Sequence, residues 1–375
     1  MKLKVITVVG TRPEIIRLSR IIKKLEFYFN HILVHTGQNY NYELSNIFFK
    51  ELKLKKPKFN LNCKSKNAIE FISKSLVRFD KILEVEKPDA VLVLGDTNSA
   101  LTVLCAKKRK IPIFHIEAGN RCFDESVPEE INRKIVDHIS DINMTYSSYA
   151  SSNLRSEGVH QDRIIKIGSP LYEVYNYYST QIDTSNILKK LKLSSQNYIL
   201  ASIHREENVD NKKNLESIFN SIVKLRKKLK LNVIFSSHPR VQKKIKKFNL
   251  KLDKNIFFYK PFSFFDYVKL MKNAKIILSD SGSITEETSI LSVPSVNLRT
   301  SNERQEGMER GLTIMSGLNS RDVLNAVEIT MSNKKKESFN SKIYYDYAIS
   351  DVSETVVKII QSYTHYINKK TWFKL

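Results

Sequence analysis

Residues 113–133 read Ile-Phe-His-Ile-Glu-Ala-Gly-Asn-Arg-Cys-Phe-Asp-Glu-Ser-Val-Pro-Glu-Glu-Ile-Asn-Arg, a short apolar strand that leads through a charged loop into a helix. A strand followed by a helix is the repeating unit of parallel α/β folds. A loop that only connects two elements more often carries glycine, serine and asparagine, because burying unpaired charges costs free energy. The clustered carboxylates and arginines therefore predict a functional site at this strand end, with a solvated ion-pair loop as the alternative.

The same alternation of short β-branched runs and helical patterns extends along the whole chain. In the first half we predict strands at residues 4–9, 31–35, 90–94, 113–116, 142–146 and 164–167, and helices at residues 13–24, 42–49, 68–86 and 99–108. In the second half we predict strands at residues 198–202, 232–236, 256–259, 275–278 and 295–298, and helices at residues 214–229, 264–272, 283–291 and 353–367.

These patterns predict an α/β fold with two doubly wound parallel-sheet domains facing a cleft. We assign residues 1–168 to the first domain and residues 169–350 to the second, with Gly168-Ser-Pro170 as the hinge. Residues 351–375 form a helix that we expect to pack back on the first domain. In such sheets ligands bind at the carboxyl ends of the strands, so polar residues just beyond a strand are the candidate site residues.

The composition, with 41% hydrophobic and 27% charged residues among 375, is that of a soluble globular protein. Lysine greatly outnumbers arginine in the net charge of +23, and no nucleic-acid-binding motif is present. We therefore predict a solvated lysine surface and an anionic small-molecule ligand rather than a nucleic acid. The chain shows no signal peptide and no apolar run that could span a bilayer, which predicts a cytoplasmic protein without an integral membrane segment. Its three cysteines form no disulfide framework by their number and spacing.

Two further strand ends of the first domain carry candidate site residues. Gly10-Thr-Arg-Pro-Glu14 opens the first helix, and backbone N–H groups beside Arg12 could bind a phosphate or a carboxylate. A glycine turn with a helix cap is the alternative. Asp96 follows the apolar run Val91-Leu-Val-Leu94 and stands at the carboxyl edge of the sheet, where it could act as a general acid or base or as a plain helix N-cap.

Two strand ends of the second domain pair a histidine with an arginine. Ser202-Ile-His-Arg-Glu-Glu-Asn208 places His204 beside Arg205, and arginine is a natural phosphate partner. Ser236-Ser-His-Pro-Arg240 repeats the arrangement one strand later, around His238. Histidine has both protonation states available near neutral pH, so these positions suit proton transfer or anion binding.

A third strand end of the second domain, Ser279-Asp-Ser-Gly-Ser-Ile-Thr-Glu-Glu287, is a strand-to-helix turn. Ser281, Gly282 and Ser283 offer N–H and hydroxyl donors at the helix N-terminus, which is the chemistry of a phosphate cradle. Glu287 lies one turn further on and could accept hydrogen bonds from vicinal ribose hydroxyls. The eight histidines are scattered without ligand spacing, so we predict no metal site.

Several motifs occur in order over almost the entire chain: Gly10-Thr-Arg-Pro-Glu14, Thr36-Gly-Gln38, Gly95-Asp-Thr97, His115-Ile-Glu-Ala-Gly119, Pro128-Glu-Glu-Ile-Asn-Arg133, His204-Arg205, Asp280-Ser-Gly282 and Asn302-Glu-Arg-Gln-Glu306. Together they resemble the bacterial non-hydrolysing UDP-N-acetylglucosamine 2-epimerase family. The resemblance implies the two-domain glycosyltransferase-B architecture, a UDP-sugar substrate, no cofactor and a homodimer.

Within that family the chain looks most similar to the branch that converts UDP-2-acetamido-2,6-dideoxy-β-L-talose to UDP-N-acetyl-L-fucosamine for capsule and O-antigen synthesis. The features of that branch are Asn120-Arg-Cys-Phe-Asp124, a short connection to Pro128, Lys134-Ile-Val-Asp-His-Ile-Ser-Asp141, Ser281-Gly-Ser-Ile-Thr-Glu-Glu287 and Glu306-Gly-Met-Glu-Arg-Gly311. Asn39 departs from the histidine of many relatives, which puts in doubt the allosteric UDP-N-acetylglucosamine site that some of them use.

The resemblance implies inversion at C2 of a UDP-N-acetyl-deoxyhexose through elimination and re-addition of UDP. The implied catalytic residues are Asp96, Glu117, Glu129 and His204. The residues implied to bind the UDP-sugar are Arg12, Arg121, Arg133, Arg205, His238, Ser281, Gly282, Ser283, Glu287 and Arg304. Arg133 is also expected to orient Glu129, and Cys122 with Phe123 to make an apolar contact with a 6-methyl group.

Two other functions fit parts of the same pattern. One is a UDP-N-acetylglucosamine 2-epimerase that forms UDP-N-acetylmannosamine. The other is a UDP-sugar-dependent glycosyltransferase of the same architecture, which would have no need for three carboxylates at strand ends of the first domain.

Overall fold

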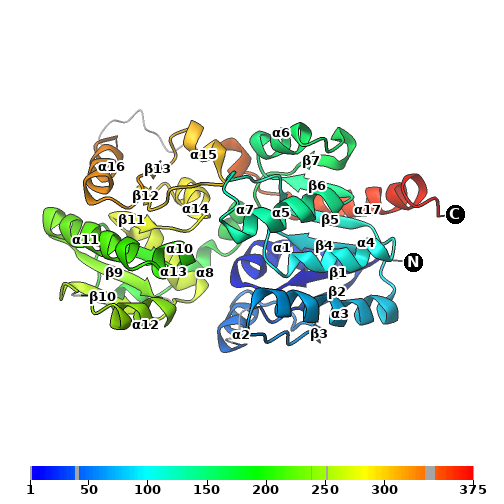
Figure 1. Ribbon diagram of the computed structural model, residues 1–375, viewed down its shortest axis with the longest axis horizontal. Coiled ribbons are helices and arrows are strands. Elements are labelled where there is room, and N and C mark those ends of the chain that lie inside the picture. Colours follow the sequence, from blue (N-terminus) through cyan, green and yellow to red (C-terminus); the bar gives the residue numbers. More distant parts are fainter. Residues whose placement is uncertain (1, 39–41, 238, 251, 334–342, 375) are drawn as a thin grey trace. The chain divides into compact units, whose positions relative to one another are not determined.

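The computed structural model describes residues 2–38, 42–237, 239–250, 252–333 and 343–374. The chain divides into two compact units: unit 1 comprises Met1–Tyr177 and Asp346–Leu375, and unit 2 comprises Tyr178–Tyr345. Each unit contains its own parallel sheet with helices on its faces (Figure 1). The prediction of two parallel-sheet α/β domains is therefore confirmed.

Unit 1 is built on a parallel sheet whose strand order, among the described residues, is β3-β2-β1-β4-β5-β6-β7. Its strands are β1 (Lys4–Val9), β2 (Asn30–His35), β3 (Phe59–Asn60), β4 (Ala90–Leu94), β5 (Ile113–Ala118), β6 (Ile142–Thr145) and β7 (Ile164–Lys166). Its helices are α1 (Arg12–Tyr28), α2 (Tyr42–Glu51), α3 (Ala68–Glu86), η1 (Ala100–Thr102), α4 (Val103–Lys108), α5 (Pro128–Ile139), α6 (Ser148–Ser156), η2 (Gln161–Arg163), α7 (Leu171–Tyr177) and α17 (Val352–Lys370).

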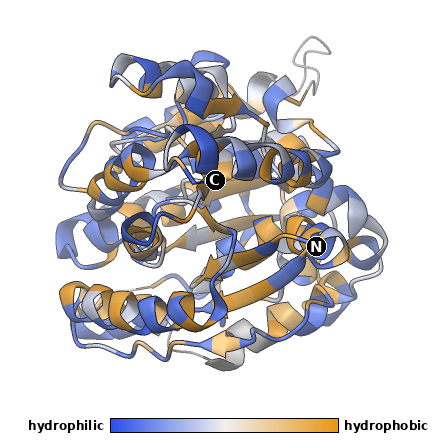
Figure 2. Cartoon of the chain, turned by 90° about the vertical axis from the view of Figure 1, so that its right-hand side faces the viewer, coloured by the Kyte–Doolittle hydropathy of each residue, from blue (hydrophilic) through white to orange (hydrophobic). Residues whose placement is uncertain are grey.

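The centre of unit 1 is apolar because its middle strands are covered on both faces. Every residue of β4 is buried, as expected for a parallel strand with helices on either side. Phe79 and Leu83 of α3 pack in the same cluster as Val91 and Val93 of that strand. Figure 2 shows these strands as largely hydrophobic, with helices of mixed hydropathy around them.

Unit 2 repeats the plan with the strand order β10-β9-β8-β11-β12-β13 among its described residues. Its strands are β8 (Tyr198–Ile203), β9 (Asn232–Ser237), β10 (Ile256–Tyr259), β11 (Ile276–Ser279), β12 (Ser295–Asn297) and β13 (Ile314–Met315). Its helices are α8 (Ser179–Asp183), α9 (Ile187–Lys190), α10 (Glu206–Val209), α11 (Lys212–Leu229), α12 (Pro239–Lys247), α13 (Phe264–Asn273), α14 (Ile284–Leu291), α15 (Gln305–Glu309) and α16 (Ser320–Asn333), and η3 (Tyr345–Tyr347) marks its border with unit 1.

The predicted boundary at Gly168 is wrong, because this glycine is packed inside unit 1. Its φ is +78°, and an added Cβ would lie 2.5 Å from Ile349 Cγ1 and 2.9 Å from the carbonyl oxygen of Asp346. Ser169 N donates to that same carbonyl oxygen at 2.9 Å. The Gly-Ser-Pro turn therefore receives the returning C-terminal segment, and α17 packs on α1 in the same unit.

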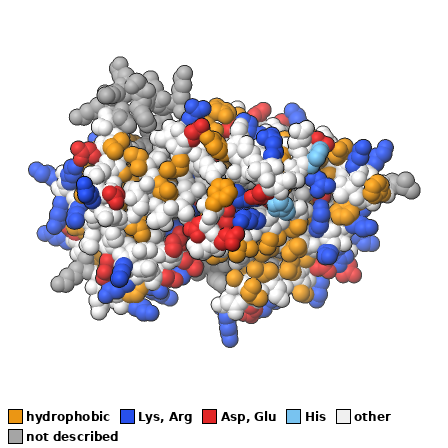
Figure 3. Space-filling view, turned by 45° about the horizontal axis from the view of Figure 1, so that its top comes forward, with side chains coloured by type: hydrophobic (Ala, Val, Ile, Leu, Met, Phe, Trp, Pro, Cys, Tyr) orange, Lys and Arg blue, Asp and Glu red, His pale blue; other side chains and the backbone are white. Residues whose placement is uncertain are grey.

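The surface carries charges of both signs. Figure 3 shows Lys and Arg side chains spread over the visible face among Asp and Glu, without one dominant basic patch on that face. Among the described residues, no helix combines the length and the apolar character that crossing a membrane requires.

Candidate active site

Asp96 is the second residue after β4, at the carboxyl edge of the unit 1 sheet. Arg133 of α5 binds its carboxylate, with Nε and Nη2 lying 3.0 and 2.5 Å from Oδ2. Asn132 Nδ2 donates to the Asp96 carbonyl oxygen at 3.0 Å, and His115 Nε2 lies 2.9 Å from the Gly95 carbonyl oxygen. Backbone and carboxylate are thus both fixed, while 28% of the Asp96 side chain remains exposed to a ligand.

Glu117 lies at the carboxyl end of β5, the neighbouring strand, rather than in the loop that follows. Its φ of +68° is in the left-handed region, and the pairing of β5 with β6 shifts register between Ile116 and Ala118. Bulges and strained residues of this kind re-aim side chains beside functional sites. Arg17 Nη1 lies 3.0 Å from Glu117 Oε2, and Asn120 Nδ2 donates to Oε1 at 3.5 Å.

The first turn of α5 carries two carboxylates with different surroundings. Glu130 is fully buried and accepts the backbone N–H groups of Cys122 and Phe123, each at 3.1 Å. Arg133 Nη1 lies 2.7 Å from Glu130 Oε2, so this arginine joins Glu130 to the Asp96 carboxylate. Glu129 is only half-buried and is the carboxylate of the pair with surface left for a ligand.

Arg121 is fully buried beneath the loop, in contact with two carboxylates. Its Nη1 lies 2.6 Å from Asp137 Oδ2, and its Nε and Nη2 donate to Glu157 at 2.7 and 2.6 Å. Burial alone would raise the pKa of Asp137, but His115 and Arg121 outweigh it and hold this pKa below its usual range. Arg121, expected to bind the substrate, thus supports the loop from inside the unit.

The turn after β1 uses its backbone donors within the protein. The N–H groups of Gly10 and Thr11 both donate to the Glu14 carboxylate, the second at 2.8 Å, so this turn is a helix cap. Burial is the main cause that raises the pKa of Glu14 to about 7, and these hydrogen bonds offset it in part. Arg12 stays exposed, with its guanidinium carbon 5.6 Å from the centre of the Phe48 ring.

In unit 2, His204 follows β8 and is oriented by Asp280, which follows β11. His204 Nδ1 lies 3.1 Å from Asp280 Oδ1, and the backbone N–H groups of His204 and Arg205 each donate to this carboxylate at 3.0 Å. Burial would raise the pKa of Asp280, but the charge and hydrogen bonds of His204 and Asn208 hold it below its usual range. The outer part of the ring is accessible, since 48% of the His204 side chain is exposed.

The predicted phosphate cradle lies at the N-terminus of α14. Ser281 Oγ and Ser283 Oγ are 2.9 Å apart, and Ser283 Oγ donates to Glu287 Oε2 at 3.1 Å. At Gly282, an added Cβ would lie 1.8 Å from Glu303 Oε1, so a larger residue here would displace the Glu303 side chain.

Three guanidinium groups lie near the cradle and contact carboxylates. Arg205 Nη2 and Arg299 Nη1 lie 3.3 and 2.7 Å from the two oxygens of Glu303. Arg304, expected to bind UDP, is buried with Nη2 3.1 Å from Glu286 Oε2. Sequence reasoning missed Arg299, although the arginine lies four residues before Glu303 of the quoted Asn302-to-Glu306 motif.

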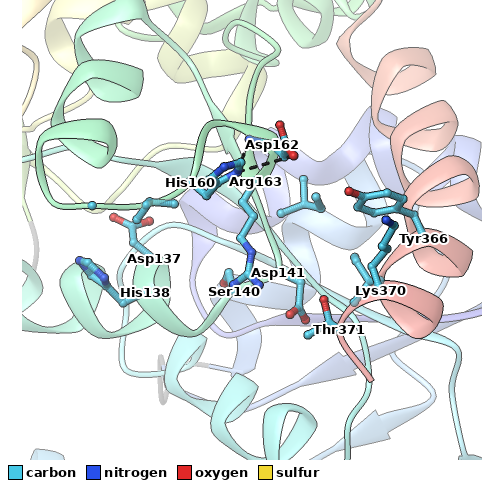
Figure 4. Close-up of a pocket in the computed structure, with 14 residues that line it drawn as sticks. Asp137, His138, Ser140, Asp141, His160, Asp162, Arg163, Tyr366, Lys370 and Thr371 are labelled. Atoms are coloured by element: carbon cyan, nitrogen blue, oxygen red, sulfur yellow. Dashed lines mark hydrogen bonds and ion pairs between the residues drawn. The ribbon is translucent and has the colours of Figure 1, made fainter. Parts of the chain in front are cut away.

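Two sequence predictions fall outside the described residues, namely His238 and Asn39. The described residues also contain a pocket of about 420 Å³ in unit 1, and Figure 4 shows Tyr366 and Lys370 reaching it from α17. Asp141 and Arg163, which also line it, directly precede β6 and β7, so the pocket lies at the amino edge of the sheet. No residue in the predicted site lines it, and the candidate site remains at the carboxyl edges.

The chain is similar to known proteins over most of its length. The family described as UDP-N-acetylglucosamine 2-epimerase matches residues 23–361. The UDP-N-acetylglucosamine 2-epimerase of Methanocaldococcus jannaschii is 41% identical over 346 residues, which are 90% of this chain and 93% of that protein. The UDP-2,3-diacetamido-2,3-dideoxy-D-glucuronate 2-epimerase of Pseudomonas aeruginosa is 33% identical over 86% of this chain and 90% of its own length.

Solved structures give the same result for the fold. The structure of UDP-N-acetylglucosamine 2-epimerase from Rickettsia bellii superposes with a TM-score of 0.92 at 45% identity, covering 100% of both chains. The Methanocaldococcus jannaschii enzyme in complex with UDP-GlcNAc and UDP has a TM-score of 0.89 at 37% identity, covering 96% of this chain and 99% of that one. The chain therefore belongs to the UDP-N-acetylglucosamine 2-epimerase family and is an isomerase.

Proposed function

We propose that this enzyme inverts C2 of a UDP-activated N-acetyl sugar by eliminating UDP and adding it back. The observation that carries the proposal is the pair Asp96 and Glu117, which stand at the ends of adjacent strands β4 and β5. Each carboxylate is bound by one arginine, and each keeps part of its surface exposed, 28% for Asp96 and 13% for Glu117. Two such groups suit a reaction that removes a proton and returns one.

The proposed steps balance without any further reactant. A carboxylate takes the proton from C2, the C1–C2 double bond of a glycal forms, and the C1–O bond breaks with its electrons leaving on UDP. UDP then adds back to C1 while C2 receives a proton on the opposite face. In our proposal Asp96 and Glu117 share the two C2 proton steps, and Glu129 stabilises the charge that develops.

Unit 2 is proposed to hold the leaving UDP. The cradle of Ser281, Gly282 and Ser283 would bind the pyrophosphate, and Glu287 would bind the ribose hydroxyls. His204, fixed by Asp280 and exposed on its outer side, would stabilise or protonate the leaving group. Arg12, Arg205 and His238 complete the proposed UDP set, while Arg121, Arg133 and Arg304 would act through the carboxylates they bind.

For the sugar, we propose UDP-2-acetamido-2,6-dideoxy-β-L-talose, converted to UDP-N-acetyl-L-fucosamine for capsule or O-antigen synthesis. The support is the Asn120-to-Asp124 segment, whose Phe123 side chain is 66% exposed and could meet a 6-methyl group. Cys122 contributes less, because its thiol turns to Glu130 Oε2 at 3.2 Å. UDP-N-acetylglucosamine is the second candidate, favoured by the names of the relatives from Methanocaldococcus and Rickettsia.

One experiment separates these possibilities. The enzyme is incubated with each UDP-sugar in deuterated water, and C2 deuterium incorporation and UDP release are followed by NMR. We expect deuterium at C2 of both epimers without net UDP accumulation, fastest with the 6-deoxy sugar. Faster exchange with UDP-N-acetylglucosamine would select the second candidate, accumulating UDP would indicate a hydrolase, and no exchange would contradict the epimerase proposal.

The resemblance also implies a homodimer and a cytoplasmic enzyme, and we include both in the proposal. Sedimentation equilibrium should give twice the mass of 43.5 kDa calculated for one chain. A mass of one chain at micromolar concentration would contradict the dimer.

A further inference from the structure

A hydrogen-bond network lies directly beside Asp96 and joins the ends of three adjacent strands. β2, β1 and β4 are neighbours in the unit 1 sheet (Figure 1), and each is followed by one of the motifs quoted above. The site described so far uses only Asp96 and Arg12 from these motifs. The remaining polar residues of the three turns bind one another.

Glu14 is the centre of this network. Its carboxylate is 2% exposed, and one oxygen, Oε2, accepts the backbone N–H groups of Gly10 and Thr11. The other oxygen, Oε1, accepts the hydroxyl of Thr97 at 2.6 Å. One side chain thus ties the turn after β1 to the residue that follows Asp96.

Ser99 forms the second half of the network. Its N–H donates to Thr97 Oγ1 at 3.2 Å and to Gln38 Oε1 at 3.1 Å. Its hydroxyl lies 2.7 Å from Thr36 Oγ1, after β2. An added Cβ on Gly10 would lie 2.0 Å from Ser99 Oγ, so the three turns are in close contact.

The Asp96 carboxylate itself takes no part in these bonds, because Arg133 binds it. The network instead holds the backbone on either side of Asp96. Gly95, before it, has a φ of +74°, and the hydroxyl of Thr97, after it, donates to Glu14. A displacement of about 1 Å at a reacting group can lower a rate 100-fold. Fixing this turn therefore matters for proton transfer at C2.

We propose that Glu14 and Thr97 are positioning residues for Asp96, with the Glu14 carboxylate holding the Thr97 hydroxyl and thereby the turn that presents Asp96. The role in catalysis rests on the proposed function, in which Asp96 moves a C2 proton. The competing view is that Glu14 only caps α1, in which case losing its bond to Thr97 would affect stability and nothing else.

The test uses Thr97→Val, which removes the hydroxyl at nearly constant volume, and Thr97→Ser, which restores it. Glu14→Asp is the second variant, because it keeps the charge but is too short to reach Thr97 and both backbone donors together. Asn67→Ala is the control, since it removes the side-chain cap of α3 in the same unit, where Asn67 accepts from Glu70 N at 2.9 Å.

Two readouts are measured, amide hydrogen exchange over residues 95–99 and the kcat and KM of C2 epimerisation. We expect Thr97→Val and Glu14→Asp to speed exchange in this segment and to lower kcat about 10- to 100-fold with KM within about threefold. Thr97→Ser should return both to within about threefold of the wild type, and Asn67→Ala should change neither.

Unchanged exchange over residues 95–99 in Thr97→Val would overturn the positioning role, whether or not the protein proves to be an epimerase. Faster exchange with an unchanged kcat would overturn its link to catalysis. If the wild type itself failed to exchange the C2 proton of the sugar, the proposed function would be wrong. Amide hydrogen exchange over residues 95–99 would still show whether Glu14 and Thr97 hold the turn that carries Asp96.

Discussion

Glu14 and Asp280 are buried carboxylates at the carboxyl edges of the two sheets, and their pKa values are shifted in opposite directions. Glu14 in unit 1 is 2% exposed and Asp280 in unit 2 is fully buried. Burial raises the pKa of Glu14 to about 7, because its partners are neutral donors and Asp96 lies nearby. Burial acts the same way on Asp280, but His204 and its hydrogen bonds reverse the outcome and lower its pKa. The charge of the partner, and not the depth of burial, therefore decides whether the pKa of each buried carboxylate is raised or lowered.

The same contrast describes the two edges as a whole. The edge of unit 1 carries Asp96 and Glu117, each bound by an arginine, together with the half-buried Glu129, which suits proton transfer. The edge of unit 2 presents a histidine and a turn of small residues at the N-terminus of α14, which suits an anion. Proton chemistry and anion binding should therefore respond to different substitutions, and this separation can be tested.

The largest effect is expected for Glu117→Gln. Removing a general acid or base from a positioned site typically lowers turnover by 10²- to 10⁴-fold, and we expect that range for kcat. The dissociation constant for UDP, measured by titration calorimetry, should stay within about twofold of the wild-type value, because Glu117 is not one of the residues proposed to bind UDP. Near-normal turnover would show that Glu117 takes no part in the reaction. A large loss of UDP affinity would contradict the separation of proton transfer in unit 1 from anion binding in unit 2.

A second prediction compares the buried carboxylates by their effect on stability. The pKa of Glu14 is raised from 4.5 to about 7, so the folded state binds this proton more tightly than the unfolded state. Its stabilising contribution is full below pH 4.5 and is lost as the pH rises through about 7, on the order of 3 kcal/mol in total. Glu14→Gln cannot titrate, so urea denaturation between these pH values should show a flatter dependence than the wild type.

Asp280→Asn is the counterpart in unit 2. The pKa of Asp280 is lowered from 3.8, so its charged form stabilises the fold above that pH and the contribution fades as the pH falls below it. At pH 6 the variant should lose about 1.5–3 kcal/mol, the value of buried hydrogen bonds to a charged group. Equal pH slopes for Glu14→Gln and the wild type, or no loss in Asp280→Asn, would contradict the opposite directions described above.

Much of the fold could be predicted from the sequence because parallel sheets give strong signals. β4 is a run of five apolar residues, and α3 shows a helical pattern whose bounds were predicted as observed. The strands β3 and β13 were missed, since two residues each are too short for any periodicity. The Gly168 turn was wrongly predicted as an inter-domain hinge. A glycine that interrupts the strand and helix pattern looks the same in sequence whether it forms a hinge or allows another segment to pack closely, as Ile349 does here.

The site could be predicted only to the level of residue types at strand ends. The sequence pointed to Asp96, Glu117 and His204, and the structure adds their partners, Arg17 among them. Those partners come from distant segments: Glu117 and Arg17 are 100 residues apart, and such pairings follow from packing. The sequence also could not say which arginine turns inward, as Arg121 does beneath its loop.

The third prediction concerns the anion-binding side alone. In Gly282→Ala, the new methyl group would lie 1.8 Å from Glu303 Oε1 and 3.3 Å from Arg299 Nη1, so the Glu303 side chain must move and its ion pair with Arg299 is disturbed. We expect UDP to bind about 10- to 100-fold more weakly by calorimetry, the effect of one or two lost charge-assisted contacts. Gly317→Ala is the control in the same unit, since its added Cβ meets nothing within 4 Å and only its φ of +66° is strained. Equal UDP affinities for the two variants would remove Gly282 from the binding site.

The smallest effect is expected at Phe123, which lies between Glu117 and Glu129 in the sequence. Its side chain is 66% exposed and its backbone N–H is anchored to Glu130 at 3.1 Å, so Phe123→Ala removes apolar surface without disturbing the charges. An apolar contact with one methyl group contributes about 1 kcal/mol, and a hydrophobic pocket discriminates weakly against an added hydroxyl. The ratio of kcat/KM for the 6-deoxy sugar over UDP-N-acetylglucosamine should therefore fall by about three- to tenfold, measured by competition between the two sugars. Ile131→Ala, an exposed residue of α5, provides the control for losing apolar surface elsewhere. An unchanged ratio in Phe123→Ala would mean that sugar selection lies outside the Asn120-to-Asp124 segment, and the first edge would then serve the C2 proton alone.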